Sequence, residues 1–201
     1  VEKPLAMTAA QAQGLADAAT AAGVFCMEAL WTRFQPLIGH VRARIAAGDL
    51  GQVTGFDGSF QVATARDPSA SLFDPARGGG ALMQRGIYPL SLAHHLLGPV
   101  TDLSAQGRIG PSGVDEDAAL ALRHASGAVS TIHASLTSDG PNTVTITGTR
   151  ATLHLAGPVW RPSSARLVPT RPGKAGGFGG TGRLSTLRET GLAQRMMQDL
   201  A

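Results

Sequence analysis

The sequence predicts an α+β fold, in which an open-faced, mainly antiparallel sheet packs helices on one face. Helical periodicity dominates the first 50 residues, whereas after residue 100 short runs of alternating apolar and polar residues follow one another. Turn signals such as Ser126-Gly127 separate these runs. Connections this short join antiparallel neighbours, and a sheet with one apolar face needs helices only on that face.

Composition places the chain among ordinary globular proteins of one large domain. Of its 201 residues, 43% are hydrophobic and 15% charged. The chain shows no apolar run long enough to cross a membrane and no signal-peptide pattern, and its lone Cys26 fits a reducing compartment, so a soluble, cytoplasmic protein is expected. Basic residues gather after Arg150, but prolines interrupt them and no stacking aromatics lie between them, so no nucleic-acid partner is expected.

The first 50 residues predict two helices with a short strand between them. Thr8 and Gln11 form a capping-box signal for a helix over 8–22. The apolar run 24–27 predicts a strand, in which Cys26 is expected to be a buried small hydrophobic residue. A second helix ends at Gly48. Its apolar face is expected to carry Phe34, Ile38, Val41 and Ile45.

A strand begins at Gln52, with apolar residues such as Phe56 and Phe60 on one face and polar ones on the other. Residues 81–97 predict a helix ended by Gly98. Further strands are expected over 100–108, 117–124, 128–137, 142–148 and 150–155. A Gly- and Pro-rich loop is then expected over 169–182, and a helix over 187–200 that stops without a cap.

Four local patterns resemble the glucose-fructose oxidoreductase, inositol dehydrogenase and MocA (Gfo/Idh/MocA) family, in particular its dimeric dihydrodiol dehydrogenase-like branch. They are Glu2-Lys3-Pro4-Leu5, the segment 27–34, Gly78-Gly79-Gly80-Ala81-Leu82-Met83 followed by Gly86-Ile87-Tyr88-Pro89, and Val159-Trp160-Arg161-Pro162. Each pattern alone is a weak signal. Their order and spacing extend the resemblance from residue 1 to about residue 162.

The resemblance implies the C-terminal domain of a two-domain, NAD(P)-dependent oxidoreductase that acts on a CH–OH group of a dihydrodiol or a sugar-like polyol. Residues 1–30 would form a junction helix and strand following a dinucleotide-binding domain that this chain lacks. Residues 31–201, with a C-terminus that looks cut, would bind substrate and form a homodimer through the sheet. The alternative is a truncated, non-catalytic homologue that acts as a dimeric scaffold or binding module.

By the same resemblance, Lys3 and Tyr88 are the catalytic pair that faces the nicotinamide ring of NADP or NAD and the reacting carbinol. Glu2, Lys3 and Pro4 would border the cofactor. Proton transfer to or from a hydroxyl needs a general acid/base and a nearby cation, and the Lys3 ammonium is expected to lower the pKa of Tyr88. If the resemblance to the family is set aside, the simplest interpretation is that Lys3 is an exposed terminal lysine and that Tyr88 is an ordinary residue of a buried helix.

Substrate-binding residues also follow from the resemblance. They are Trp31, Arg33, Phe60, Gln84, Trp160 and Phe178. Gln84 stands where the family usually carries Asp, so it can hydrogen-bond but carries no charge. Core packing remains an equal interpretation of Phe60.

Three other patterns indicate no site. The six histidines have no Cys or acidic partner at metal-ligand spacing, so no metal is expected. The run Asp115-Glu116-Asp117 alternates faces on a strand and so does not form a carboxylate pair. The GxGxxG match at 177–182 follows a loop instead of a strand, so it is interpreted as loop.

Overall fold

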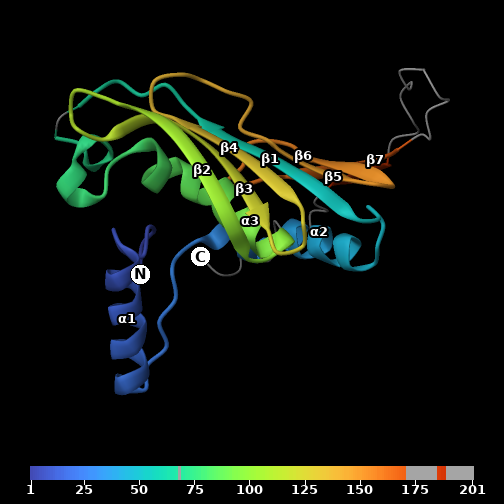
Figure 1. Ribbon diagram of the computed structural model, residues 1–201, viewed down its shortest axis with the longest axis horizontal. Coiled ribbons are helices and arrows are strands. Elements are labelled where there is room, and N and C mark those ends of the chain that lie inside the picture. The colour runs from blue at the N-terminus through green and yellow to red at the C-terminus, as the bar shows by residue number, and fades with distance from the viewer. Residues whose placement is uncertain (68, 171–184, 189–201) are drawn as a thin grey trace.

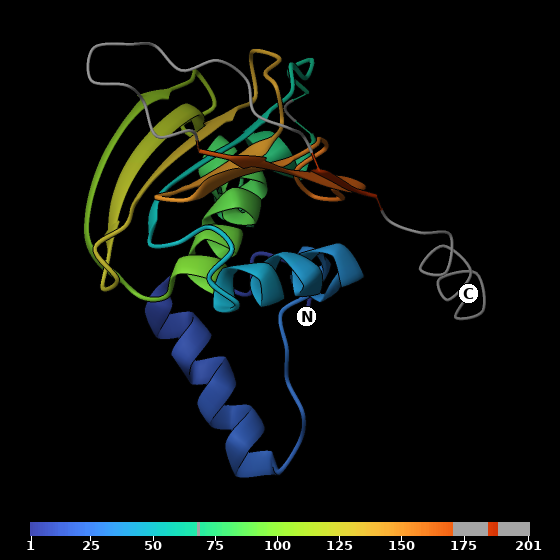
Figure 2. The ribbon, with the colours of Figure 1, turned by 90° about the vertical axis from the view of Figure 1, so that its right-hand side faces the viewer.

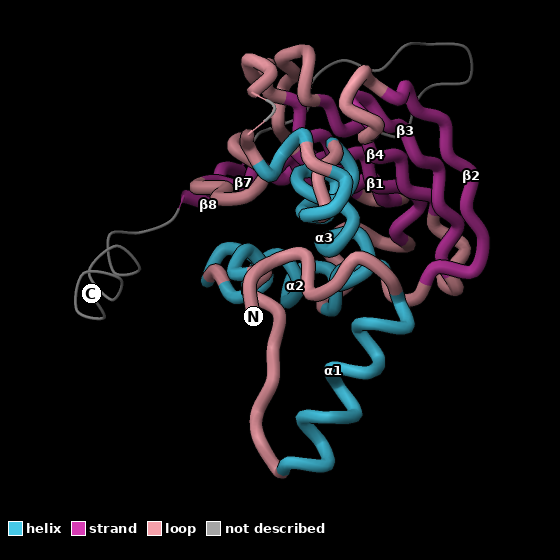
Figure 3. The backbone as a smooth tube through the Cα atoms, turned by 90° about the vertical axis from the view of Figure 1, so that its left-hand side faces the viewer, coloured by secondary structure: helices cyan, strands magenta, loops and turns pink. Residues whose placement is uncertain are grey.

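The computed structural model describes residues 1–67, 69–170 and 185–188 and shows one eight-stranded sheet with helices beneath it (Figure 1). The strand order is β2-β3-β4-β1-β5-β6-β7-β8. β2 and β8 are the two edge strands (Figure 3). The strands are β1 (Val53–Gln61), β2 (Val100–Ile109), β3 (Asp115–His124), β4 (Val129–Ser135), β5 (Val144–Gly148), β6 (Ala151–Leu155), β7 (Ser164–Pro169) and β8 (Ser185–Arg188).

Three α-helices and four short helical turns complete the described fold. The α-helices are α1 (Ala9–Ala22), α2 (Pro36–Ala46) and α3 (Ile87–Leu97). The 3₁₀ turns are η1 (Trp31–Phe34), η2 (Ser71–Phe73) and η3 (Pro75–Arg77), and η4 (Leu82–Gly86) is a π-helical turn that leads directly into α3. The predicted fold class is confirmed, as are the predicted strands from β2 to β6, within a few residues at their ends.

One strand pairing departs from the predicted chain of antiparallel neighbours. β1 lies between β4 and β5, parallel to β4 and antiparallel to β5. The short β4–β5 connection therefore joins strands that are not neighbours, because β1 occupies the position between them. Alternating burial cannot reveal this insertion, since it reports which face a residue lies on and not which strand lies beside it.

Helix α1 begins as predicted. The Thr8 hydroxyl accepts from the Gln11 N–H, the Gln11 side chain accepts from the Thr8 N–H, and Gly23 ends the helix in the left-handed conformation. No residue of α1 is buried, and the helix extends away from the sheet and from the other helices (Figure 2). Its apolar residues therefore add nothing to the core of the described structure.

The predicted strand over 24–27 is wrong. These residues are extended coil, with Val24 60% exposed and Phe25 86% exposed, and Cys26 is exposed instead of buried. The N-terminal amino group of Val1 donates to the Met27 carbonyl at 3.0 Å, and the Ala29 N–H donates to the Val1 carbonyl at 2.8 Å. An apolar run becomes a strand only where a ladder of partners continues along it, and these two bonds are too few.

The predicted apolar face of the second helix is wrong at its first member. Phe34 is 64% exposed and lies in η1, before the helix. α2 begins at Pro36, where proline fits because the first helical N–H has no intrahelical acceptor. The predicted helix over 187–200 is also wrong at Leu187 and Arg188, which belong to β8, and its remainder lies outside the described residues.

The core lies between the sheet and helices α2 and α3 (Figure 2). Ile38 from α2, Leu92 from α3 and Ile146 from β5 have no exposed surface. Gly58 on β1 lets α3 approach closely, because a Cβ there would stand 2.9 Å from the Cβ of Pro89. This close approach fixes the start of α3, where Tyr88 lies, against the sheet.

We expect Leu92→Ala to lower the free energy of unfolding by about 2–5 kcal/mol, because it removes a fully buried side chain and leaves a cavity. Leu15→Ala on α1 is the matched control, since Leu15 is 40% exposed. Its effect should stay within about 0.5 kcal/mol. Urea unfolding followed by circular dichroism measures both, and equal losses would contradict this placement of the core.

Candidate functional site

A hollow of about 260 Å³ opens on the helix-covered side of the sheet, where η4 and α3 run along β1. Ligand pockets usually measure about 300–1,000 Å³, so this hollow suits a small molecule. Its lining residues are Lys3, Phe60, Leu72, Gln84, Arg85, Tyr88 and Trp160. Five of these were predicted from the sequence as site residues, so the fold brings together positions from four separate parts of the chain.

Lys3 is held by Gln84. Its Nζ donates to the main-chain oxygen and to the side-chain Oε1 of Gln84, both at 2.9 Å. Among the described residues no acceptor takes the third N–H of the ammonium. Burial lowers the pKa of Lys3, the nearby Glu2 carboxylate opposes this change, and the Arg85 guanidinium adds to it.

Tyr88 lies at the start of α3 and accepts a hydrogen bond from the Trp31 side chain. Burial raises the pKa of Tyr88, the Trp31 hydrogen bond opposes this rise, and the Glu2 carboxylate adds to it. The expected lowering of the Tyr88 pKa is therefore wrong, and Lys3 is not among the groups that shift this pKa. The Lys3 Nζ stands over the ring, 5.6 Å from its centroid, and donates to Gln84 instead of to the phenol.

Aromatic side chains form one wall of the hollow. Phe60 stacks on Trp160 with 4.4 Å between ring centroids, and it meets Tyr88 edge to face at 5.5 Å. Thr32 and Gln35 both donate to the Trp160 carbonyl, at 2.7 Å and 3.0 Å, and so fix this wall to η1. Phe60 also packs against the main core, so core packing is confirmed for it, while its role in binding substrate stays a prediction.

Other predicted site residues lie outside this lining. Arg33 donates through Nε to the Ser91 hydroxyl of α3, and Trp31 reaches the site only through its bond to Tyr88. Glu2 is exposed and Pro4 is half-buried beside Lys3. Phe178 and the GxGxxG match at 177–182 lie outside the described residues.

Sequence reasoning missed Leu72 and Arg85. Leu72 belongs to η2, in a segment expected to be loop, and carries no pattern that could have marked it. Arg85 did carry a signal, because it is three residues before Tyr88 and so shares its helix face, and because a charged residue is unusual in a buried helix. Arg85 is only 7% exposed.

Two other buried side chains, Glu116 and His124, have structural partners. Glu116 has no exposed surface and accepts from Arg66 and Arg108, and Asp117 lies on the other face of β3, as expected for neighbouring strand residues. The buried His124 contacts the Gly98 carbonyl at 2.8 Å. Within 1–67, 69–170 and 185–188, no group of three His, Cys, Asp or Glu side chains is placed to hold a metal ion.

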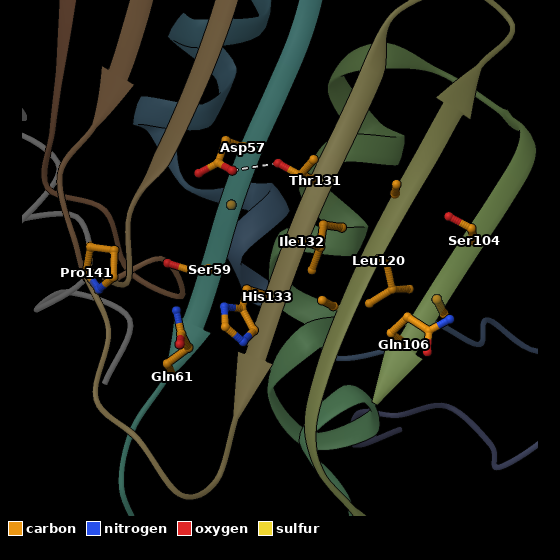
Figure 4. A pocket seen from close by; sticks show the side chains of 14 residues that line it. Asp57, Ser59, Gln61, Ser104, Gln106, Leu120, Thr131, Ile132, His133 and Pro141 are labelled. Atoms are coloured by element: carbon orange, nitrogen blue, oxygen red, sulfur yellow. Dashed lines mark hydrogen bonds between the residues drawn. The ribbon is translucent and has the colours of Figure 1, made fainter. Parts of the chain in front are cut away.

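A second hollow, of about 470 Å³, lies on the open face of the sheet (Figure 4). Polar side chains from β1 and β4 line it, and the Thr131 hydroxyl donates to the Asp57 carboxylate at 2.6 Å. None of the catalytic residues predicted from the sequence reaches this hollow.

No helix in the described part of the chain is both long and apolar enough to span a membrane.

Comparisons with known proteins agree with this fold and these motifs. The GFO/IDH/MocA C-terminal domain matches residues 38–154, more than half of the chain. The trans-1,2-dihydrobenzene-1,2-diol dehydrogenase of Sus scrofa is 32% identical over 183 residues, and that of Bos taurus is 30% identical over 187 residues. These alignments cover 86% and 88% of this chain but 54% and 55% of the relatives. The chain therefore spans about half the length of the curated relatives that it matches.

Solved structures show the same architecture. An NAD-binding oxidoreductase from Klebsiella pneumoniae superposes with a TM-score of 0.78 at 27% identity, over 93% of this chain and 53% of that one. Levoglucosan dehydrogenase with NADH and L-sorbose gives a TM-score of 0.80 at 22% identity, over 95% of this chain and 54% of its own, which shows the shared fold. Fold, motifs and relatives define the C-terminal domain of an oxidoreductase class. The chain belongs to the GFO/IDH/MocA family.

We expect Tyr88 to ionise above pH 10, because burial raises its pKa from the ordinary value of 10.0. Trp31→Phe should raise the midpoint further, since the Trp31 hydrogen bond favours the phenolate. Tyr88 is the only tyrosine of the chain, so tyrosinate absorbance reports it alone. The chain in denaturant is the control, and its tyrosine should ionise with a midpoint at about pH 10. A native midpoint below that of the control would contradict the assignment.

Proposed function

We propose that this chain is the substrate-binding part of an NAD(P)-dependent oxidoreductase acting on a CH–OH group, or on the corresponding carbonyl, of a dihydrodiol or sugar-like substrate. The observation that carries the proposal is the hollow in which an ammonium, a phenol and an aromatic wall meet. In this proposal residues 1–30 are the junction with a dinucleotide-binding domain, and residues 31–201 bind substrate.

The donor groups of the hollow fit a nicotinamide reaction. Lys3 keeps one N–H without an acceptor, and the Tyr88 oxygen accepts from Trp31 while no acceptor for its own proton is found in the described part of the chain. Both donors belong to residues that line one small hollow. Bound there, a nicotinamide would supply or accept the hydride, with Glu2, Lys3 and Pro4 along its border.

The pKa directions divide the acid/base work between the two residues. Since the pKa of Tyr88 is raised, it remains a phenol at neutral pH and can give its proton to the oxygen of a carbonyl that is being reduced. The Lys3 ammonium stabilises the negative charge that develops on this oxygen. In the oxidation direction the carbinol carbon would give its hydride to the nicotinamide, and the carbinol oxygen would give its proton to Tyr88 after the phenol has lost its own proton to solvent.

In a two-domain form of the enzyme, Tyr88→Phe should lower turnover by about 10² to 10⁴, because it deletes only the hydroxyl and leaves the ring packing intact. Lys3→Met should also lower turnover, and the two losses should be less than additive because both act on one proton transfer. Steady-state kinetics on a substrate whose hydride step limits the rate measures these effects.

Thr54→Val is the matched control for this series, since it removes an exposed hydroxyl that does not line the hollow. Its turnover should equal that of the parent enzyme. Nucleotide binding should be unchanged in Tyr88→Phe and in Thr54→Val. Near-parental turnover of Tyr88→Phe would show that another group transfers the proton. A folded two-domain protein without turnover on any polyol would favour the scaffold alternative.

We also propose that the open face of the sheet forms a homodimer. Along β3 and β4, exposed residues alternate with buried ones, and the exposed set includes Val129, Thr131 and His133. In the described residues nothing covers this face, whereas helices cover the other (Figure 1). A single face that meets its own copy gives the closed two-fold contact common among soluble oligomers.

The dimer predicts that Ala119→Arg produces monomers, because a bulky cation at the centre of the open face would meet its own copy near the symmetry axis. Ala43→Arg on the exposed side of α2 is the matched control and should leave the dimer intact. Light scattering at tens of micromolar protein distinguishes the two. A monomeric parent chain would remove the proposal.

A further inference from the structure

The hollow that holds Lys3 and Tyr88 is lined by two cations and by no carboxylate. Lys3 and Arg85 both belong to its lining, and its remaining members are aromatic, aliphatic or amide side chains. Gln84 beside Lys3 carries no charge, and its side chain is already engaged, since Oε1 accepts from Lys3 and Nε2 donates to the Gly78 carbonyl at 2.8 Å. The hollow therefore presents positive charge to whatever enters it.

Arg85 is a buried cation without an acidic partner. Its guanidinium donates to the carbonyls of Val62 and Ser135 and to the Thr64 hydroxyl, but no carboxylate in the described residues lies within ion-pair distance. These bonds use three of its five N–H groups, and no acceptor among residues 1–67, 69–170 and 185–188 takes the other two. A buried charge normally has a counter-charge, because leaving it unpaired is costly.

Neither acidic residue near these cations completes the site. Glu2 acts on the pKa of Lys3 but is exposed and does not line the hollow. Asp139 acts on the pKa of Arg85 but accepts from the Ala63 N–H at 2.9 Å on the exposed surface. The described residues thus balance the positive charge inside the hollow only in part.

We propose that the natural substrate is a hydroxy acid of the sugar-acid type, whose ionised carboxylate binds near Lys3 and Arg85 while its carbinol faces Tyr88. The unused N–H groups of Lys3 and Arg85 supply donors for the two carboxylate oxygens. Phe60 and Trp160 supply an apolar wall for the C–H face of the ring. The small size of the hollow favours a carboxylate over a bulkier phosphate ester. The inference rests on the proposed function, because it names the substrate class of the same site.

Binding to the 201-residue chain tests this inference without nucleotide or turnover. D-Glucuronate, D-glucose and D-glucose 6-phosphate are titrated at low salt, with tryptophan fluorescence as the readout. Trp160 lines the hollow and Trp31 contacts Tyr88, and they are the only two tryptophans of the chain. Glucuronate should bind at least about tenfold more tightly than glucose, and added salt should weaken this preference.

Two variants locate the preference. Gln84→Glu places a carboxylate beside Lys3 and should abolish the preference for glucuronate over glucose. Arg85→Gln should reduce this preference. The control Arg42→Gln, on the exposed side of α2, should leave it unchanged. If Arg85→Gln does not fold, Gln84→Glu still decides. Equal binding of glucuronate and glucose, binding of neither, or tighter binding of the phosphate overturns the inference. Because no turnover is measured, these outcomes are distinct from a failure of the proposed oxidoreductase activity.

Discussion

The buried guanidinium of Arg85 ties the site helix to the sheet. It donates to the Val62 carbonyl just after β1 and to the Ser135 carbonyl at the end of β4, so it binds the ends of the two parallel strands. Gly86 allows this, because a Cβ there would lie 3.3 Å from the Cβ of Ala134 on β4. The positions of Gln84 and Tyr88, and through Gln84 of Lys3, all depend on this attachment.

The same attachment gives the hollow its electrostatic character. Burial lowers the pKa of Lys3 and raises that of Tyr88, so the two groups shift in opposite directions, each toward its uncharged form. Arg85 keeps its charge because a guanidinium does not deprotonate in proteins. This permanent cation gives the hollow a positive charge that does not depend on the protonation state of Lys3.

Local signals predicted most of the fold, and the family resemblance named five of the seven residues that line the hollow. The Thr8–Gln11 capping box and the turn at Ser126-Gly127 depend on neighbours in sequence, and both elements form where expected. The predictions for 24–27 and Phe34 were wrong because burial depends on partners that hydrophobicity alone does not identify. Motifs named Lys3, Gln84 and Tyr88, but Arg85 was missed because its importance comes from carbonyls about 20 and 50 residues away.

The position of β1 also shapes how the chain reaches its native state. Gly55 of β1 pairs with Val129 on one side and with Thr147 on the other. The central strand β1 therefore cannot pair until β4 and β5, which come much later in the sequence, have been synthesised. The β2-β3-β4 and β5-β6-β7 meanders can each close through short turns, as local hairpins. Joining these halves around β1 requires closing long loops, which makes folding slow in topologies with distant contacts. Until that step, both halves carry an unpaired edge, so assembly of the central strand is the stage at which this chain is most exposed to aggregation.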